Sequence, residues 1–139
     1  MTLRRQRAIA TTLVLLVAAA LTPRLAAAQA AGAADSTVQA GLFGCARERA
    51  LAAGFAPLPT QRPGRLTMTR ANETPGPRYP LDALSFRAAA DSAGSLRLEV
   101  RVTTFMMSRE GINSEQVEPR ASLAALADSI RVQCRAGSN

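Results

Sequence analysis

Residues 95–107 read SLRLEVRVTTFMM, and this stretch contains the clearest strand pattern in the chain. The apolar residues of its first half occupy even positions: Leu96, Leu98, Val100 and Val102. The polar residues occupy odd positions: Arg97, Glu99, Arg101 and Thr103. A period of two is typical of a strand with one face buried and the other in water. We therefore expect a strand over Ser95–Met107 in a sheet that has one solvated face.

Two further strands are predicted upstream of this stretch. Asp91–Gly94 has the composition of a hairpin turn with Gly at the position that takes positive φ. Leu84, Phe86 and Ala88 alternate with polar residues before that turn, and this favours a strand over Ala83–Ala90, although its Ala run leaves a short helix as the alternative. Arg65–Ala71 alternates in the same way and predicts a third strand.

Helical patterns flank these strands on both sides. A first helix is expected at about Thr37–Ala53, with a left-handed stop at Gly54 and Phe55 folded back onto its last turn. Its apolar face is narrow and mostly small: Leu42, Ala46, Ala50 and Ala53, with Phe43 at the edge. A second helix is expected after Pro119, with a regular buried stripe. That stripe consists of Leu123, Leu126, Ala127, Ile130 and Cys134.

The remaining segments are predicted to be irregular. Ala56–Gly64 is rich in proline and is expected to be an extended connector. Asn72–Asp82 and Ser108–Glu118 are expected to be surface loops. The predicted fold class is α+β: a small two-layer domain over residues 36–135 in the order α-β-β-β-α. In it, a three-stranded antiparallel sheet carries both helices on one face.

The N-terminus has the three parts of a secretory signal peptide. Arg4, Arg5 and Arg7 form a basic start, residues 8–22 form an uncharged apolar run, and Ala28-Gln29-Ala30 supplies small residues at Ala28 and Ala30 for the signal peptidase. The run is shorter than the ~20 residues of a membrane-spanning helix. We expect cleavage of residues 1–30, a flexible leader at 31–35, a frayed tail at 136–139, and a periplasmic or secreted protein with no stable membrane span.

Composition excludes several kinds of chemistry. The chain has no His, so it lacks an imidazole base, nucleophile partner or metal ligand. Loss of four signal-peptide arginines leaves 13 of the 17 basic residues against 10 acidic ones, a net charge of +3. These arginines are dispersed, whereas a nucleic-acid interface would cluster them among aromatic residues. We therefore expect no nucleic-acid partner, no metal, no cofactor and no enzymatic activity.

Two cysteines lie near opposite ends of the mature chain, at Cys45 and Cys134. An even number of cysteines in an exported protein favours a disulfide. The alternative is a reactive thiol, which an arginine could activate. The structural disulfide is favoured because the chain has neither a C-x-x-C spacing nor a His.

Two surfaces are candidates for binding. Phe105, Met106 and Met107 interrupt the alternation and could form an apolar surface for a partner, or a strand end that turns into the core. Arg87, Arg97 and Arg101 could contact anionic surfaces from the solvated sheet face. The sequence therefore favours a monomeric, non-catalytic domain of the bacterial envelope that binds a protein or an apolar envelope component. One alternative is a structural or stress-related accessory protein on anionic envelope surfaces, and the other is an exported thiol enzyme.

Overall fold

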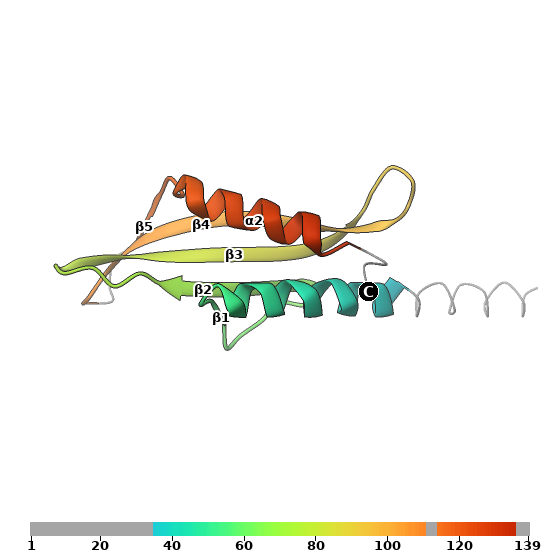
Figure 1. Cartoon of the computed structure of the whole chain (residues 1–139). Coiled ribbons are helices and arrows are strands. Elements are labelled where there is room, and N and C mark those ends of the chain that lie inside the picture. Colours follow the sequence, from blue (N-terminus) through green and yellow to red (C-terminus); the bar gives the residue numbers. More distant parts are fainter. Residues whose placement is uncertain (1–34, 111–113, 136–139) are drawn as a thin grey trace, which may run out of the picture. The chain divides into compact units, whose positions relative to one another are not determined.

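The computed structural model describes residues 35–110 and 114–135. Nearly all of them belong to one unit, Val38–Asn139. The fold is α+β, but its sheet has five strands instead of the predicted three, in the order α-β-β-β-β-β-α. The strands are β1 (Ala56–Pro57), β2 (Arg65–Ala71), β3 (Arg78–Ala90), β4 (Leu96–Ser108) and β5 (Ser114–Val117). A helix covers residues 35–52, and α2 covers Ala121–Gln133 (Figure 1).

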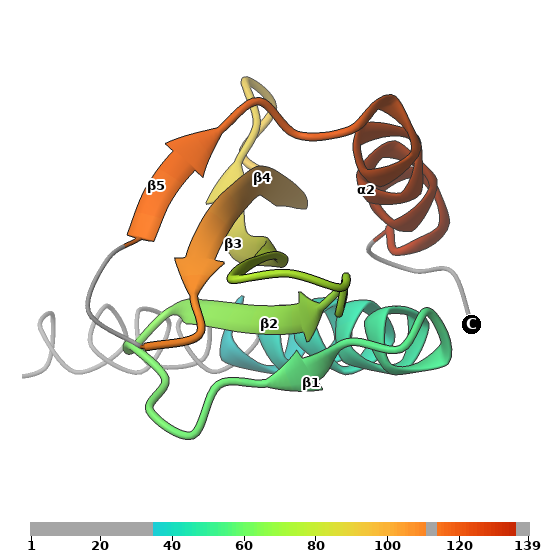
Figure 2. The ribbon, with the colours of Figure 1, turned by 90° about the vertical axis from the view of Figure 1, so that its left-hand side faces the viewer.

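The five strands form an antiparallel meander in chain order, from β1 at one edge to β5 at the other (Figure 2). The two strands absent from the prediction are the short edge strands. β1 contains only Ala56 and Pro57 within the connector, and β5 has the sequence SEQV, with one apolar residue. Neither segment is long or apolar enough to show a period of two.

The predicted loop over Asn72–Asp82 is wrong in its second half, because β3 already begins at Arg78. Pro80 made that half resemble a loop. In the observed register Pro80 lies opposite Met106 of β4 and just beyond Ala71, the last residue of β2. Its carbonyl accepts a hydrogen bond from the Asn72 N–H at 2.8 Å. Proline is tolerated here because its missing N–H would face the end of β2, not the middle of a ladder.

The faces of the central strands agree with the predicted alternation. The register aligns Leu66 with Phe86 and Phe86 with Val100, and it places Met68, Leu84 and Val102 in the next row. We call the face formed by the even-numbered residues of β2, β3 and β4 the helix face, and the face formed by the odd-numbered residues the open face. The alternative of a short helix over 83–90 is thereby excluded.

Both helices pack on the helix face, and their predicted stripes form the core with it. The buried cluster consists of Leu42, Ala46, Ala50, Phe55, Met68, Leu84, Phe86, Leu98, Leu123, Ala127, Ile130 and Cys134. The first helix ends as predicted: Gly54 has φ of 82°, and Phe55 is buried. The N–H groups of Phe55 and Gly54 donate to the carbonyls of Ala50 and Leu51 at 3.0 and 2.9 Å, which is a Schellman motif. The helix already includes Asp35, a residue predicted to belong to the leader.

The predicted disulfide is present between Cys45 and Cys134, with their Cα atoms 5.7 Å apart. It joins the first helix to the residue that follows α2, and the two helices run in opposite directions (Figure 1). The bond indicates an oxidising location outside the cytoplasm. The predicted signal peptide and most of the leader (residues 1–34) and the tail (136–139) lie outside the described residues.

Candidate binding groove

The β2 edge of the sheet is covered over most of its length. Thr69 pairs with Ala56 of β1, and the Thr67 carbonyl accepts a hydrogen bond from the Leu58 N–H at 3.0 Å. The Gln61 side chain also makes the two hydrogen bonds that a neighbouring strand would make. Its oxygen accepts from the Thr67 N–H at 2.8 Å, and its nitrogen donates to the Thr67 carbonyl at 3.0 Å. Covering an edge in this way prevents another chain from pairing with it.

The opposite edge is covered over only part of its length. β5 pairs with Thr104–Met107 of β4, and no strand among the described residues pairs with the outer side of residues 96–103. The ladder between β3 and β4 ends in hydrogen bonds from the Asp91 N–H to the Ser95 carbonyl and from the Arg109 N–H to the Pro77 carbonyl. Both are odd-numbered pairs. The odd residues of β4 therefore bond to β3, and the even residues direct their N–H and C=O groups outwards.

A groove runs along this free edge and beside α2. Its volume is about 910 Å³, and every residue from Ser95 to Val102 lines it. Successive side chains of a strand point to opposite faces, so a groove lined by consecutive residues of β4 follows the edge of that strand. Its lining also includes Arg65 of β2 and Ser85 and Arg87 of β3, so the groove continues from this edge onto the open face. The α2 side of the groove includes the small residues Ala124 and Ala127 and the exposed Val132.

The groove contains the excess positive charge of the domain. Its lining has six arginines (Arg65, Arg87, Arg97, Arg101, Arg131 and Arg135) and three acidic residues (Asp91, Glu99 and Asp128), a net charge of +3. The described residues outside the groove contain seven arginines and seven acidic residues, so their charges balance. The net +3 of the described domain therefore lies in the lining of this groove, which includes the β4 edge, α2 and the adjoining part of the open face.

Some of these charges are already paired. Arg87 lies 2.7 Å from Glu99, and Arg131 lies 2.9 Å from Asp128. The hydrogen bond and charge of Arg87, with a smaller contribution from Arg97, lower the pKa of Glu99 below its usual value of 4.5. Arg97 and Arg101 are exposed and form no ion pair within the described part of the chain. They are the cations beside the free edge that can accept an anionic partner.

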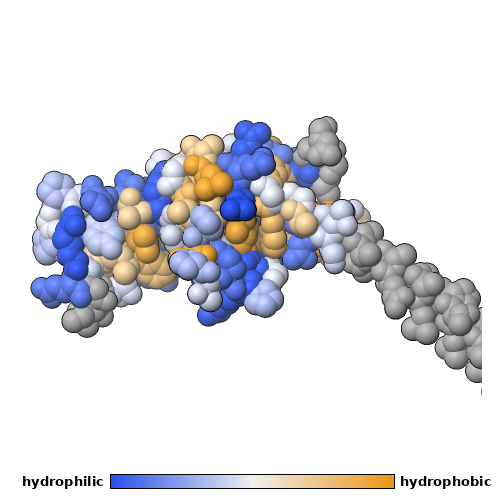
Figure 3. All heavy atoms as spheres, turned by 90° about the horizontal axis from the view of Figure 1, so that it is seen from below, coloured by the Kyte–Doolittle hydropathy of each residue, from blue (hydrophilic) through white to orange (hydrophobic). Residues whose placement is uncertain are grey.

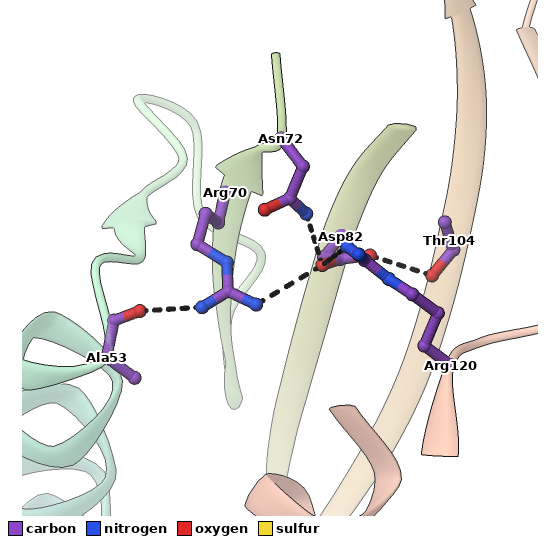
Figure 4. Close-up of polar contacts among 6 residues, drawn as sticks. All are labelled: Ala53, Arg70, Asn72, Asp82, Thr104 and Arg120. Carbon is purple, nitrogen blue, oxygen red and sulfur yellow. Dashed lines mark hydrogen bonds and ion pairs between the residues drawn. The ribbon is translucent and has the colours of Figure 1, made fainter. Parts of the chain in front are cut away.

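A second polar group lies on the helix face, centred on Asp82 (Figure 4). The Asp82 side chain is fully buried. Its Oδ1 accepts a hydrogen bond from the Thr104 hydroxyl at 2.9 Å, and its Oδ2 accepts from the Asn72 amide at 2.6 Å. The guanidinium groups of Arg70 and Arg120 approach Oδ2 at 3.4 and 3.3 Å. Each oxygen of this buried carboxylate therefore has at least one polar partner.

The Asp82 group joins both helices to the sheet. Arg70 donates to the carbonyl of Ala53, just after the first helix, at 2.8 Å, and its guanidinium lies 4.5 Å from the centre of the Phe55 ring. Arg120 is the N-cap residue of α2. Arg70 thus places its charge at the C-terminus of the first helix, where a cation is favourable because it faces the negative end of the helix dipole. This arrangement is structural: it holds α2, and therefore one wall of the groove, in place.

The sequence did not predict this polar group. Asp82 was predicted to lie in a loop, and the roles of Arg70, Asn72, Thr104 and Arg120 were not recognised. A signal was present, because Arg70 is in phase with Leu66 and Met68, and Asp82 is in phase with Leu84. A charged residue on the buried phase of a strand requires a partner of opposite charge on the same face.

The residues of the predicted apolar surface do not share one face. Met106 lies on the helix face, whereas Phe105 and Met107 lie on the open face, and all three are half-buried between β3 and β5. By contrast, Arg87, Arg97 and Arg101 are all exposed on the open face. The structure thus brings the three predicted arginines together and separates the three predicted apolar residues.

The exposed large apolar side chains of the described residues are dispersed. They are Val38, Leu51, Leu58 and Val132. Seen from below, apolar areas of the surface lie between hydrophilic ones (Figure 3). Among the described residues, no three His, Cys, Asp or Glu side chains are placed to hold a metal ion. No helix in this part of the chain has the length and apolar character needed to cross a membrane.

Comparison of the chain with models of protein families, with curated proteins and with solved structures finds no match in any of the three.

Proposed function

We propose that this protein is an exported, non-catalytic binding domain of the bacterial envelope that holds a partner protein in the groove between the β4 edge and α2. The observation that carries the proposal is the contrast between the two edges of the sheet. β1 and Gln61 cover the β2 edge, whereas residues 96–103 of β4 keep an open edge beside a groove of about 910 Å³. Proteins usually protect such edges, so an open one indicates a place for another chain.

Export is supported by two independent features. The signal-like sequence of residues 1–30 predicts secretion, and the Cys45–Cys134 disulfide indicates an oxidising compartment. Both cysteines are used in this bond, so the structure offers no support for an exported thiol enzyme. Intact-mass analysis of the exported protein tests this part. We expect a chain that begins at Ala31 and resists alkylation until it is reduced. A chain that keeps Met1, or that contains free thiols, would contradict it.

The binding part is tested by site-specific photocrosslinking in the cells that produce the protein. A photoreactive residue replaces Val132, which is 53% exposed and lines the groove, or Leu51, which is 45% exposed on the first helix and outside it. The proposal predicts a discrete covalent adduct with an envelope protein at position 132 and none at position 51. Equal adducts at the two positions, or none at position 132, would contradict it.

The alternative function, attachment to anionic envelope surfaces, is favoured by one observation. Arg87, Arg97 and Arg101 share the open face and are exposed. However, Arg87 is already paired with Glu99, so of these three arginines Arg97 and Arg101 are the two without an ion pair among the described residues. Binding to vesicles of anionic lipid that weakens sharply with added salt would support this alternative. Absence of such binding would exclude it.

A further inference from the structure

We infer that the groove binds an extended acidic polypeptide segment, which pairs with β4 as an additional strand and alternates acidic with apolar side chains. This inference rests on the proposed function and names the chemistry of the partner. It follows from three properties of the same site: the direction of the free backbone groups, the difference between the two faces, and the sign of the charge.

The backbone supplies the first requirement. Leu96, Leu98, Val100 and Val102 direct their N–H and C=O groups away from β3, and nothing in residues 35–110 and 114–135 pairs with them there. Seven residues of strand span about 20 Å at a rise of ~3.3 Å per residue. An extended segment of similar length can satisfy all of these groups by strand addition.

The two faces then determine the side chains of the added strand. On the helix face, its residues would lie beside Val100 and Val102 and beneath α2, where the small residues Ala124 and Ala127 line the groove. On the open face, its residues would lie opposite Arg97 and Arg101, at the separation of a cross-strand pair. Alternating apolar and acidic residues fit this pattern.

Charge favours an acidic segment over a second copy of this chain. The groove has a net charge of +3, and the rest of the described domain is neutral. Pairing two β4 edges would bring two such grooves together, and like charges repel. A segment rich in Glu or Asp instead pairs with Arg97 and Arg101, and it is attracted before contact.

The direct test uses a blocked eight-residue peptide of alternating Val and Glu, labelled with a fluorophore and added to the disulfide-bonded domain. We expect saturable binding that weakens with salt. Two control peptides test the chemistry. Replacing Glu by Lys should abolish binding, and N-methylation of alternate backbone amides should weaken it at least about tenfold, because it removes the strand hydrogen bonds.

Protein variants locate the site. The double variant Arg97→Glu and Arg101→Glu should weaken peptide binding at least about tenfold. A matched double variant, Arg47→Glu and Arg62→Glu, makes the same change of charge at exposed positions outside the groove and should bind within about twofold of the wild type. Circular dichroism of both variants should match the wild type, because none of the four side chains is buried.

The outcomes separate the inference from the proposed function. Failure of the Val/Glu peptide to bind at about 1 mM, or equal binding of the Lys peptide, overturns the inference. If Val132 still crosslinks to an envelope protein in that case, the proposed function stands with a partner of different chemistry. Binding of phosphatidylglycerol vesicles that is lost in Arg97→Glu and Arg101→Glu, without competition from the peptide, also overturns the inference.

Discussion

Arg120, the residue that precedes α2, lies with its Nη2 atom 3.3 Å from Oδ2 of Asp82 in β3. This pair fixes the beginning of α2 over the sheet, and the Cys45–Cys134 bond fixes the residue that follows it. The helix is therefore held at both ends, by an ion pair before its first residue and by a disulfide after its last. A wall held in this way gives the groove a defined width before any partner binds, which reduces the entropy lost on binding.

The disulfide should contribute strongly to stability. Its cysteines are separated by 89 positions. Closing a loop of this size lowers the conformational entropy of the unfolded chain, which raises the free energy of unfolding by roughly 4–5 kcal/mol as an upper value. We expect the double variant Cys45→Ala and Cys134→Ala to lose a large part of that free energy of unfolding, measured by urea denaturation. Reductant should destabilise the wild type by a similar amount and leave the variant unchanged. Equal midpoints for the two proteins would contradict this role.

The Asp82 group should be more important to stability than the surface ion pairs. Asp82→Ala leaves the Arg70 guanidinium without its buried counter-charge, and we expect a loss of about 2–3 kcal/mol of unfolding free energy. Arg120→Ala should lose less than about 1 kcal/mol, because the Arg120 side chain is 57% exposed. The control Asp128→Ala breaks an exposed pair and should have almost no effect. Equal losses in all three variants would be inconsistent with a structural role for Asp82.

Alanine substitution of two glycines, one inside the first helix and one at its C-terminal cap, should change the free energy of unfolding in opposite directions. Gly54 has φ of 82°, so Gly54→Ala should lose about 1 kcal/mol through backbone strain, although its new Cβ would meet only Arg70 Cδ at 3.7 Å. Gly41 lies inside the helix, and a new Cβ there would have no atom within 4 Å other than those of its chain neighbours and the surrounding helix backbone, so Gly41→Ala should gain up to about 1 kcal/mol. Thermal unfolding of both variants checks the signs. A stabilising Gly54→Ala would refute the left-handed cap.

The Arg87–Glu99 pair predicts a pH effect with a definite sign. The pKa of Glu99 lies below 4.5 in the folded protein. The pair therefore stabilises the fold at pH values above the unfolded pKa, and this contribution is lost as the pH falls through the lowered folded value. Carboxyl NMR titration should give a lower midpoint for Glu99 in the wild type than in Arg87→Gln. The same midpoint in both proteins would show that Arg87 is not the cause.

The sequence predicted the elements with long periodic patterns and missed those that depend on neighbours. The strand at Arg65–Ala71, the hairpin at Asp91–Gly94 and the disulfide all follow from local pattern or cysteine count, and the structure confirms them. β1 and β5 exist because β2 and β4 offer edges to them, which a local pattern does not contain. The three predicted arginines share a face because alternation fixes their phase. The groove was not predictable, because it depends on where β5 stops and where α2 lies.

The most direct test of the account is amide hydrogen exchange along β4, residue by residue, in the free protein. The free-edge register predicts an alternating pattern: slow exchange at Arg97, Glu99 and Arg101, whose N–H groups bond to β3, and fast exchange at Leu98, Val100 and Val102, whose N–H groups point into the groove. The fast amides should slow when the Val/Glu peptide is added. Uniform slow exchange over residues 96–103 in the free protein would mean that this edge is already covered, and would contradict the proposed binding groove.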